Sequence, residues 1–159
     1  MHHMRRKERQ LSEEDTLRVL REGVFGVLSL VTPEGTPYGI PLTYAVENGQ
    51  GLSLYIHCAR EGRKLGCLHG DSVAAHFVVV GATRVVPQKF TIEYESVMLE
   101  GRLAEVTDEA EKRRGLVCIA HKYAAAYDGP GCADAAGKAT RVLRLDVESM
   151  SGKRLREDA

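Results

Sequence analysis

The stretch TPYGIPLTYAVENGQGLSLYIH, from Thr36 to His57, decides the fold. Large and small residues alternate in its first half, and Leu, Tyr and Ile dominate its second half. This pattern is typical of two β-strands, over 36–46 and 52–57. Asn48 and Gly49 lie between the two segments and favour a hairpin turn, because both residues tolerate positive φ. We therefore expect two neighbouring antiparallel strands.

A third strand is predicted just before this pair. The sequence VFGVLSLV, residues 24–31, is almost entirely apolar, and the turn residues Pro33, Glu34 and Gly35 follow it. The three strands are therefore expected to form an antiparallel meander.

The strand predicted over 36–46 has two unequal faces. One face carries large residues, and the other carries only Gly39, Pro41, Thr43 and Ala45. Such a small strip lets a flat group approach the backbone, but it equally suits packing against another element. Pro41 lacks an N–H group, which indicates an edge or bulged position.

Helices and further strands are predicted on both sides of the meander. Ser12 is a suitable N-cap for a helix that Gly23 ends, and Asp108 begins a longer helix with Leu116 and Ile119 on one face. The remaining expected elements are a short helix within 57–68, strands over 72–81, 91–107 and 140–149, a looser segment over 82–90 and a Gly/Ala-rich loop over 128–138. Six strands with peripheral helices predict a mainly β protein, a small antiparallel barrel.

Length and composition favour one domain without a strongly charged partner. The 159 residues suit a single domain over 4–159, with residues 1–3 a possible tag or start scar, and the formal net charge is zero. This balance gives no reason to expect nucleic acid or a membrane as partner. Four cysteines without a CxxC motif, and no secretory or membrane-spanning apolar segment, predict a cytoplasmic protein.

The segment HCAREGRKLGCL, residues 57–68, places three cations at the start of a short predicted helix. Arg60, Arg63 and Lys64 are unfavourable there, because a helix N-terminus carries partial positive charge. One interpretation is a solvated surface. The other is a phosphate cradle, in which Gly62 lets the backbone approach the anion.

Five segments together resemble a known family, the FMN-binding split-barrel proteins related to pyridoxamine 5′-phosphate oxidase. They are similar above all to its Nim-type branch, which is associated with 5-nitroimidazole resistance. The segments, in the family's order, are MRRKERQLSEED (4–15), GTPYGIPLTYAVENG (35–49), LYIHCAREGRKLGCLHGDSVAAHF (54–77), YESVMLEGRLAEVTDEAEKRRGL (94–116) and VESMSGK (147–153).

The resemblance implies a homodimeric six-stranded split β-barrel with FMN at the subunit interface. It assigns the FMN phosphate to Arg63 and Lys64 beside Gly62. The flavin ring would contact the two strand ends, and the partner subunit would contribute from the fifth strand. The residues so implied are Pro41, Leu42 and Thr43, then His57, Cys58 and Ala59, and from the partner Ser96 and Val97. The implied activity is that of a flavin-dependent oxidoreductase, nitroreductase-like, with a reduced nicotinamide donor and a small-molecule acceptor.

Where this sequence departs from the family's pattern, the range of expected activities becomes narrower. The oxidase itself has an Arg/His substrate signature and a tryptophan-bearing tail, whereas this chain ends MSGKRLREDA and contains no Trp. Pyridoxamine phosphate oxidation is therefore not expected. His57 is a candidate proton donor, or a locally bonded structural residue. The alternative function is a split-barrel binding protein that carries flavin, deazaflavin or haem without turnover. A metal site from His57, Cys58, Cys67 and His69 fits no standard zinc spacing.

Overall fold

A computed structural model describes residues 5–49, 51–126, 129–137 and 139–156. The possible scar at residues 1–3 lies outside these ranges. The helices are the 3₁₀ turns η1 (Lys7–Arg9) and η2 (Pro87–Lys89), with α1 (Glu13–Glu22), α2 (Arg63–Gly66), α3 (Glu109–Tyr123) and α4 (Gly129–Gly137). The strands are β1 (Gly26–Val31), β2 (Pro37–Leu42), β3 (Ala45–Asn48), β4 (Leu52–Ala59), β5 (Val73–Val86), β6 (Thr91–Glu105) and β7 (Thr140–Leu155).

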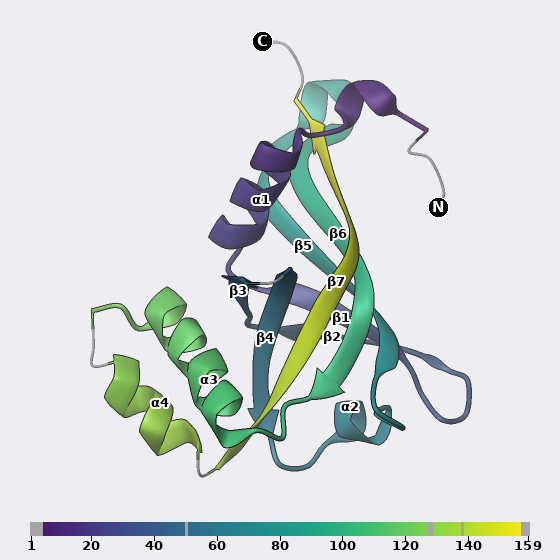
Figure 1. Cartoon of the computed structure of the whole chain (residues 1–159). Helices are drawn as coiled ribbons and strands as arrows, with labels where there is room; N and C mark the ends of the chain where they lie inside the picture. Colours follow the sequence, from purple (N-terminus) through teal and green to yellow (C-terminus); the bar gives the residue numbers. More distant parts are fainter. Residues whose placement is uncertain (1–4, 50, 127–128, 138, 157–159) are drawn as a thin grey trace.

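The strands form one strongly twisted antiparallel sheet (Figure 1). Its seven strands in the described ranges follow the order β2-β1-β5-β6-β7-β4-β3. The edges β2 and β3 are consecutive in the chain but do not pair, so the barrel is split between them. Pro41 lies on the edge strand β2, as its missing N–H predicts. Mainly β architecture with a split barrel is confirmed.

The prediction of a three-stranded meander in a six-stranded barrel is wrong at one point. The strand expected over 36–46 breaks after Leu42, and its two halves become β2 and β3. Tyr44 turns its ring into the core, where the hydroxyl donates to Leu20 O and the ring meets Phe77 edge-on at 5.1 Å. Its backbone N–H donates to the Tyr123 hydroxyl at 3.1 Å, which replaces a strand partner. The chain then continues as β3, which pairs with β4 alone.

Two long strands extend beyond their predicted ends. β5 continues to Val86 because a bulge near Gly81 shifts the register and hides the alternation, after which Thr83 pairs with Tyr94. β7 continues to Leu155 beyond a similar irregularity at Glu148. The expected loop over 128–138 is largely helix α4, because buried Ala133 packs it against α3.

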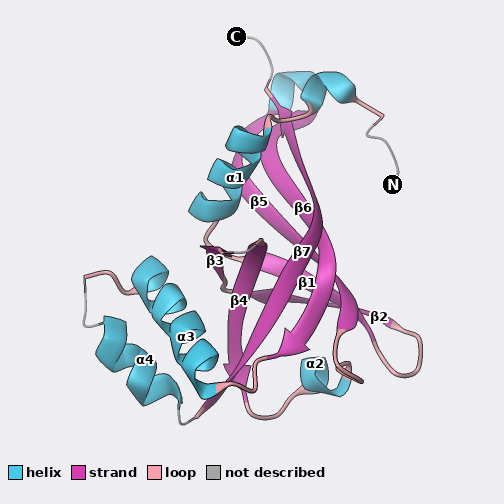
Figure 2. Ribbon diagram, in the orientation of Figure 1, coloured by secondary structure: helices cyan, strands magenta, loops and turns pink. Residues whose placement is uncertain are grey.

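Two apolar clusters hold the elements together. The larger fills the barrel and includes Leu28, Phe77 and Leu145, and the smaller lies between the outer face of β4 and the helices α3 and α4, around Tyr55. In α1, Ser12 accepts a hydrogen bond from Asp15 N–H at 3.1 Å, which confirms the predicted cap. α1 contacts β5, β6 and β7 at one end of the barrel (Figure 2).

The outer face of β1, β5 and β6 carries exposed apolar side chains. Val27, Val78 and Met98 are aligned across these three strands by the register. Phe25 and Val80 continue the patch, and each is 57% exposed. Exposed apolar area of this kind on one sheet face is typical of contact surfaces.

Candidate functional site

A tight glycine loop joins the end of β4 to the single turn of α2. Gly62 has a φ of 144°, which L side chains rarely adopt, and its carbonyl accepts a hydrogen bond from Leu65 N–H at 3.0 Å. The glycine leaves the backbone uncovered at this turn. The positive φ explains why a glycine stands here, and the role of Gly62 as a point of close approach stays a prediction.

The three cations of this loop point to different neighbours. The Arg63 guanidinium lies 4.8 Å from the centre of the Tyr38 ring on β2. Arg60 lines a cavity beside α3 and α4. Lys64 lies near the end of β4, close enough to influence the Cys58 thiol. The loop thus links β2 to β4 through Arg63, whereas Arg60 does not share that surface.

His57 and Cys58 occupy opposite faces at the end of β4. Cys58 faces the barrel interior, and burial raises the pKa of its thiol. His57 is on the outer face with Ser53 and Tyr55, opposite Val142 of β7. Burial lowers the pKa of His57, and its Nδ1 has no hydrogen-bond partner in the described part of the chain. Ala59, the last residue of β4, is exposed.

The split of the barrel lies beside the predicted flavin strip. Pro41 is exposed at the end of β2, Leu42 packs partly against the barrel core, and Thr43 follows in the break. Tyr44 follows Thr43 in the chain. The Lys122 ammonium lies 3.7 Å from the centre of the Tyr44 ring. Its Nζ is buried without a hydrogen-bond partner among the described residues, and burial lowers its pKa to about 8.

The predicted residues of β6 lie far from this loop within one chain. Ser96 pairs with Lys153 of β7, eleven residues beyond Val142, the partner of His57. At about 3.3 Å per residue this separation is roughly 35 Å along the strand. The Ser96 side chain is on the outer face with Val80, and Val97 is buried in the core. One chain therefore does not bring Ser96 and Val97 to His57 and the glycine loop, although the register places Val97 level with Leu42 across β1 and β5.

Tyr38, Lys122 and Tyr123 are neighbours of the site that the sequence analysis did not select. Lys122 and Tyr123 are close to Tyr44 only because α3 packs beside β3, almost eighty residues later in the chain. A local sequence pattern holds no signal for such a contact. Tyr38 is one of the large residues of β2, and its contact with Arg63 depends on the path of the loop.

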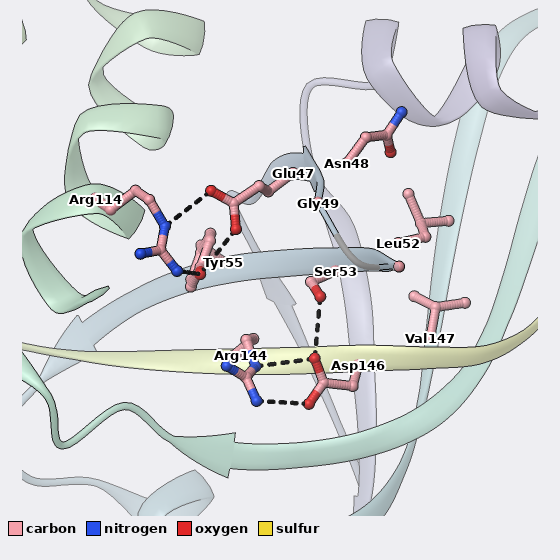
Figure 3. A pocket seen from close by; sticks show the side chains of 11 residues that line it. Glu47, Asn48, Gly49, Leu52, Ser53, Tyr55, Arg114, Arg144, Asp146 and Val147 are labelled. Atoms are coloured by element: carbon pink, nitrogen blue, oxygen red, sulfur yellow. Dashed lines mark hydrogen bonds and ion pairs between the residues drawn. The ribbon is translucent and has the colours of Figure 1, made fainter. Parts of the chain in front are cut away.

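A second pocket, of about 590 Å³, lies between the β3–β4 hairpin, β7 and α3 (Figure 3). The Tyr55 hydroxyl lies 3.0 Å from Glu47 and receives a hydrogen bond from Arg114 at 3.1 Å. Arg144 pairs with Asp146 and Glu111, and its pKa is raised by these hydrogen bonds. Because these charges pair with one another, the network fastens α3 to the sheet.

Metal binding has no support in the described ranges of the chain. No three His, Cys, Asp or Glu side chains there come close enough to share an ion. His57 and Cys58 point to opposite faces of β4, and the Cys67 thiol lies 3.5 Å from the Arg63 carbonyl oxygen, as a donor to it.

Comparison with known families identifies the fold. The family model described as pyridoxamine 5′-phosphate oxidase matches residues 12–154. The chain belongs to this family. The match covers the glycine loop, both strands that flank the split and the outer-face patch. Curated protein sequences give no significant match.

Solved structures with this fold differ in what they are named for. A protein from Bacteroides thetaiotaomicron named for 5-nitroimidazole antibiotic resistance has 23% identity and a TM-score of 0.71, covering 96% of each chain. A FAD-binding protein from Mesorhizobium loti has 22% identity and a TM-score of 0.67, over 93% of this chain and 98% of that one. A FAD and haem binding protein from Mycobacterium smegmatis has 20% identity and a TM-score of 0.72, over 95% and 77%. These likenesses show a shared fold.

Proposed function

We propose that the protein is a flavin-dependent oxidoreductase, nitroreductase-like, that binds the flavin mononucleotide portion of its cofactor beside the split of the barrel. The observation that carries the proposal is the contact of the glycine loop with the edge strand β2 through Arg63 and Tyr38. It joins a basic, glycine-containing turn to a strand edge of small residues. A phosphate and a flat ring need these two features next to each other.

The residues present fit a flavin in their donor chemistry as well. Arg63 and Lys64 would hold the phosphate, and the backbone of Pro41, Leu42 and Thr43 would orient the ring. Nδ1 of His57 is buried and lacks a hydrogen-bond partner within the described chain, so a ligand atom that reached it would satisfy it. A bound flavin supplies hydride acceptance and electron transfer.

The remaining chemistry assigned to the chain is proton transfer by His57. Reduction of a nitro group consumes protons, and an imidazole delivers them near neutral pH. Because burial lowers the pKa of His57, the imidazolium that donates is the minority form at neutral pH, and its share rises as the pH falls through the acidic range. We expect the acceptor half-reaction to accelerate over that acidic range.

The proposed assembly is a homodimer with the cofactor at the interface. Two observations support it: the exposed apolar patch around Val27, Val80 and Met98, and the place of Ser96, which is buried on the same face opposite Val80. A second copy lying on this face would bring Ser96 to the partner's glycine loop.

The helices that the structure describes include none long and apolar enough to cross a membrane.

The absorption spectrum of the purified protein tests the proposal. The expected result is a flavin band that dithionite or a reduced nicotinamide bleaches and that a nitroaromatic acceptor restores by re-oxidising the flavin. A colourless protein that takes up neither FMN nor FAD contradicts it. A sharp Soret band favours the second candidate, a haem-binding protein without turnover.

A further inference from the structure

The ring of Tyr38 is a fixed platform beside the glycine loop. Tyr38 is half-buried on the edge strand β2, where it packs against the barrel core together with Ile40 and Leu42. Arg63 is exposed, and its guanidinium lies over this ring, with Cζ 4.8 Å from the ring centre. The contact therefore ties an exposed side chain of the loop to a residue that the core holds in place.

This contact leaves the hydrogen-bonding groups of Arg63 available. A guanidinium meets an aromatic ring through its flat face, whereas its N–H groups lie in its own plane. The same N–H groups form the paired, charge-assisted hydrogen bonds by which arginine binds a phosphate. One arginine can therefore contact the Tyr38 ring and a phosphate at the same time.

A carboxylate close to Arg63 offers its guanidinium another position. Glu34 lies in the turn between β1 and β2. Hydrogen bonds with Thr32 and with its own backbone lower the pKa of Glu34, and the nearby charge of Arg63 lowers it further. A guanidinium that left the ring would be free to pair with this carboxylate, which would neutralise its charge. The Tyr38 ring favours the position in which that charge remains open to an outside anion.

The second cation of the proposed phosphate site is held differently. The Lys64 Nζ lies 3.9 Å from the place that a Cβ on Gly62 would take, so this ammonium stays close to the loop backbone. Only Arg63 of the two lies against an aromatic ring in the described part of the chain. A change at Tyr38 should therefore reach the phosphate through Arg63.

We propose that Tyr38 is a positioning residue for phosphate recognition, which holds the Arg63 guanidinium at β2 with its N–H groups open to the phosphate of FMN. The proposal rests on the proposed function, because that function assigns the FMN phosphate to Arg63. Tyr38 acts through the face of its ring, and its hydroxyl has no part. Its effect should appear with FMN and be absent with riboflavin, which has the same flavin ring and no phosphate.

The test measures the Kd values of FMN and riboflavin by calorimetry on the apoprotein. Tyr38→Leu removes the ring and keeps an apolar side chain against the core. It should raise the FMN Kd about three- to fivefold, the range of an exposed cation–ring contact, and leave the riboflavin Kd unchanged. Tyr38→Phe keeps the ring and is the matched control, with wild-type values for both. In an Arg63→Ala background, Tyr38→Leu should change the FMN Kd no further.

A Tyr38→Leu variant that weakens both flavins alike, or neither, would overturn the proposal, as would a Tyr38→Phe variant as weak as Tyr38→Leu. If the leucine variant does not fold, nuclear magnetic resonance of the wild-type protein decides. The Tyr38 ring current should shift the Arg63 Nε–H resonance upfield, both without ligand and with FMN bound. Loss of this shift on FMN binding overturns the proposal while FMN binding stands. A wild-type protein that binds neither flavin overturns the proposed function itself.

Discussion

Lys122 is half-buried, and its buried ammonium lies against an aromatic ring. Burial lowers its pKa to about 8, against about 10.5 for the unfolded chain, so the folded state disfavours the charged form. The unfolded chain therefore binds more protons between pH 8 and 10.5, and stability rises with pH over that window. The contact with Tyr44 offsets part of the cost below it.

We predict that Lys122→Met increases the free energy of unfolding at pH 7 by about 1 kcal/mol, after allowance for solvent screening. The gain should shrink as the pH rises from 8 to 10, because the lysine is then neutral in the folded state. Lys122→Arg keeps its charge and should bring no gain. Urea unfolding at pH 7 and pH 10 measures the difference, and an equal gain at both values would contradict the explanation.

A second prediction for a single side chain concerns proton transfer by His57. His57→Ala should leave flavin affinity unchanged within a few-fold, yet slow acceptor reduction about 10²-fold and remove its acceleration at acidic pH. Hydride transfer from the nicotinamide to the flavin should continue at its normal rate. Stopped-flow measurement of the two half-reactions separates them, with His69→Ala as the control. Unchanged rates in both half-reactions would leave His57 with a structural role alone.

At the scale of single elements, the glycine loop and helix α2 supply the side chains proposed to bind the FMN phosphate. Charge-assisted hydrogen bonds contribute about 1.5–3 kcal/mol each. The double variant Arg63→Ala, Lys64→Ala should therefore raise the FMN Kd at least tenfold. Arg21→Ala on α1 removes a cation elsewhere and should leave the Kd unchanged. Calorimetry on the apoproteins measures both, and equal Kd values would return these cations to the solvated surface.

Sequence patterns predicted the elements whose causes are local. The Ser12 and Asp108 caps, the Asn48-Gly49 turn and the apolar run of β4 each depend on a few neighbouring residues. The break of the strand at Tyr44 depends on Tyr123, and α4 depends on packing against α3, so neither has a nearby signal. The candidate site divides in the same way. A local sequence pattern predicts the glycine loop, whereas no local pattern predicts that Lys122 lies beside Tyr44.

At the scale of the whole molecule, the exposed patch predicts self-association. Met98→Glu places a charge in the middle of this patch, where Met98 is 46% exposed. We expect the mass measured by light scattering to fall from twice 17.5 kDa to that of one chain, and bound flavin to be lost with it. Ala135→Glu, on the exposed side of α4, should remain dimeric. A wild-type protein that is monomeric with flavin bound would refute the interface.

The break between β2 and β3 is held by hydrogen bonds to one side chain, the phenol of Tyr123. The Tyr123 hydroxyl lies 3.1 Å from Tyr44 N and 2.7 Å from Val24 O, so it occupies the place that a neighbouring strand would take. Tyr123 is the last residue of α3, where a helix frays most readily. Fraying of that final turn withdraws the phenol and lets water reach the Tyr44 amide. Deuterium exchange at Tyr44 therefore follows the opening of the helix end rather than the unfolding of the barrel.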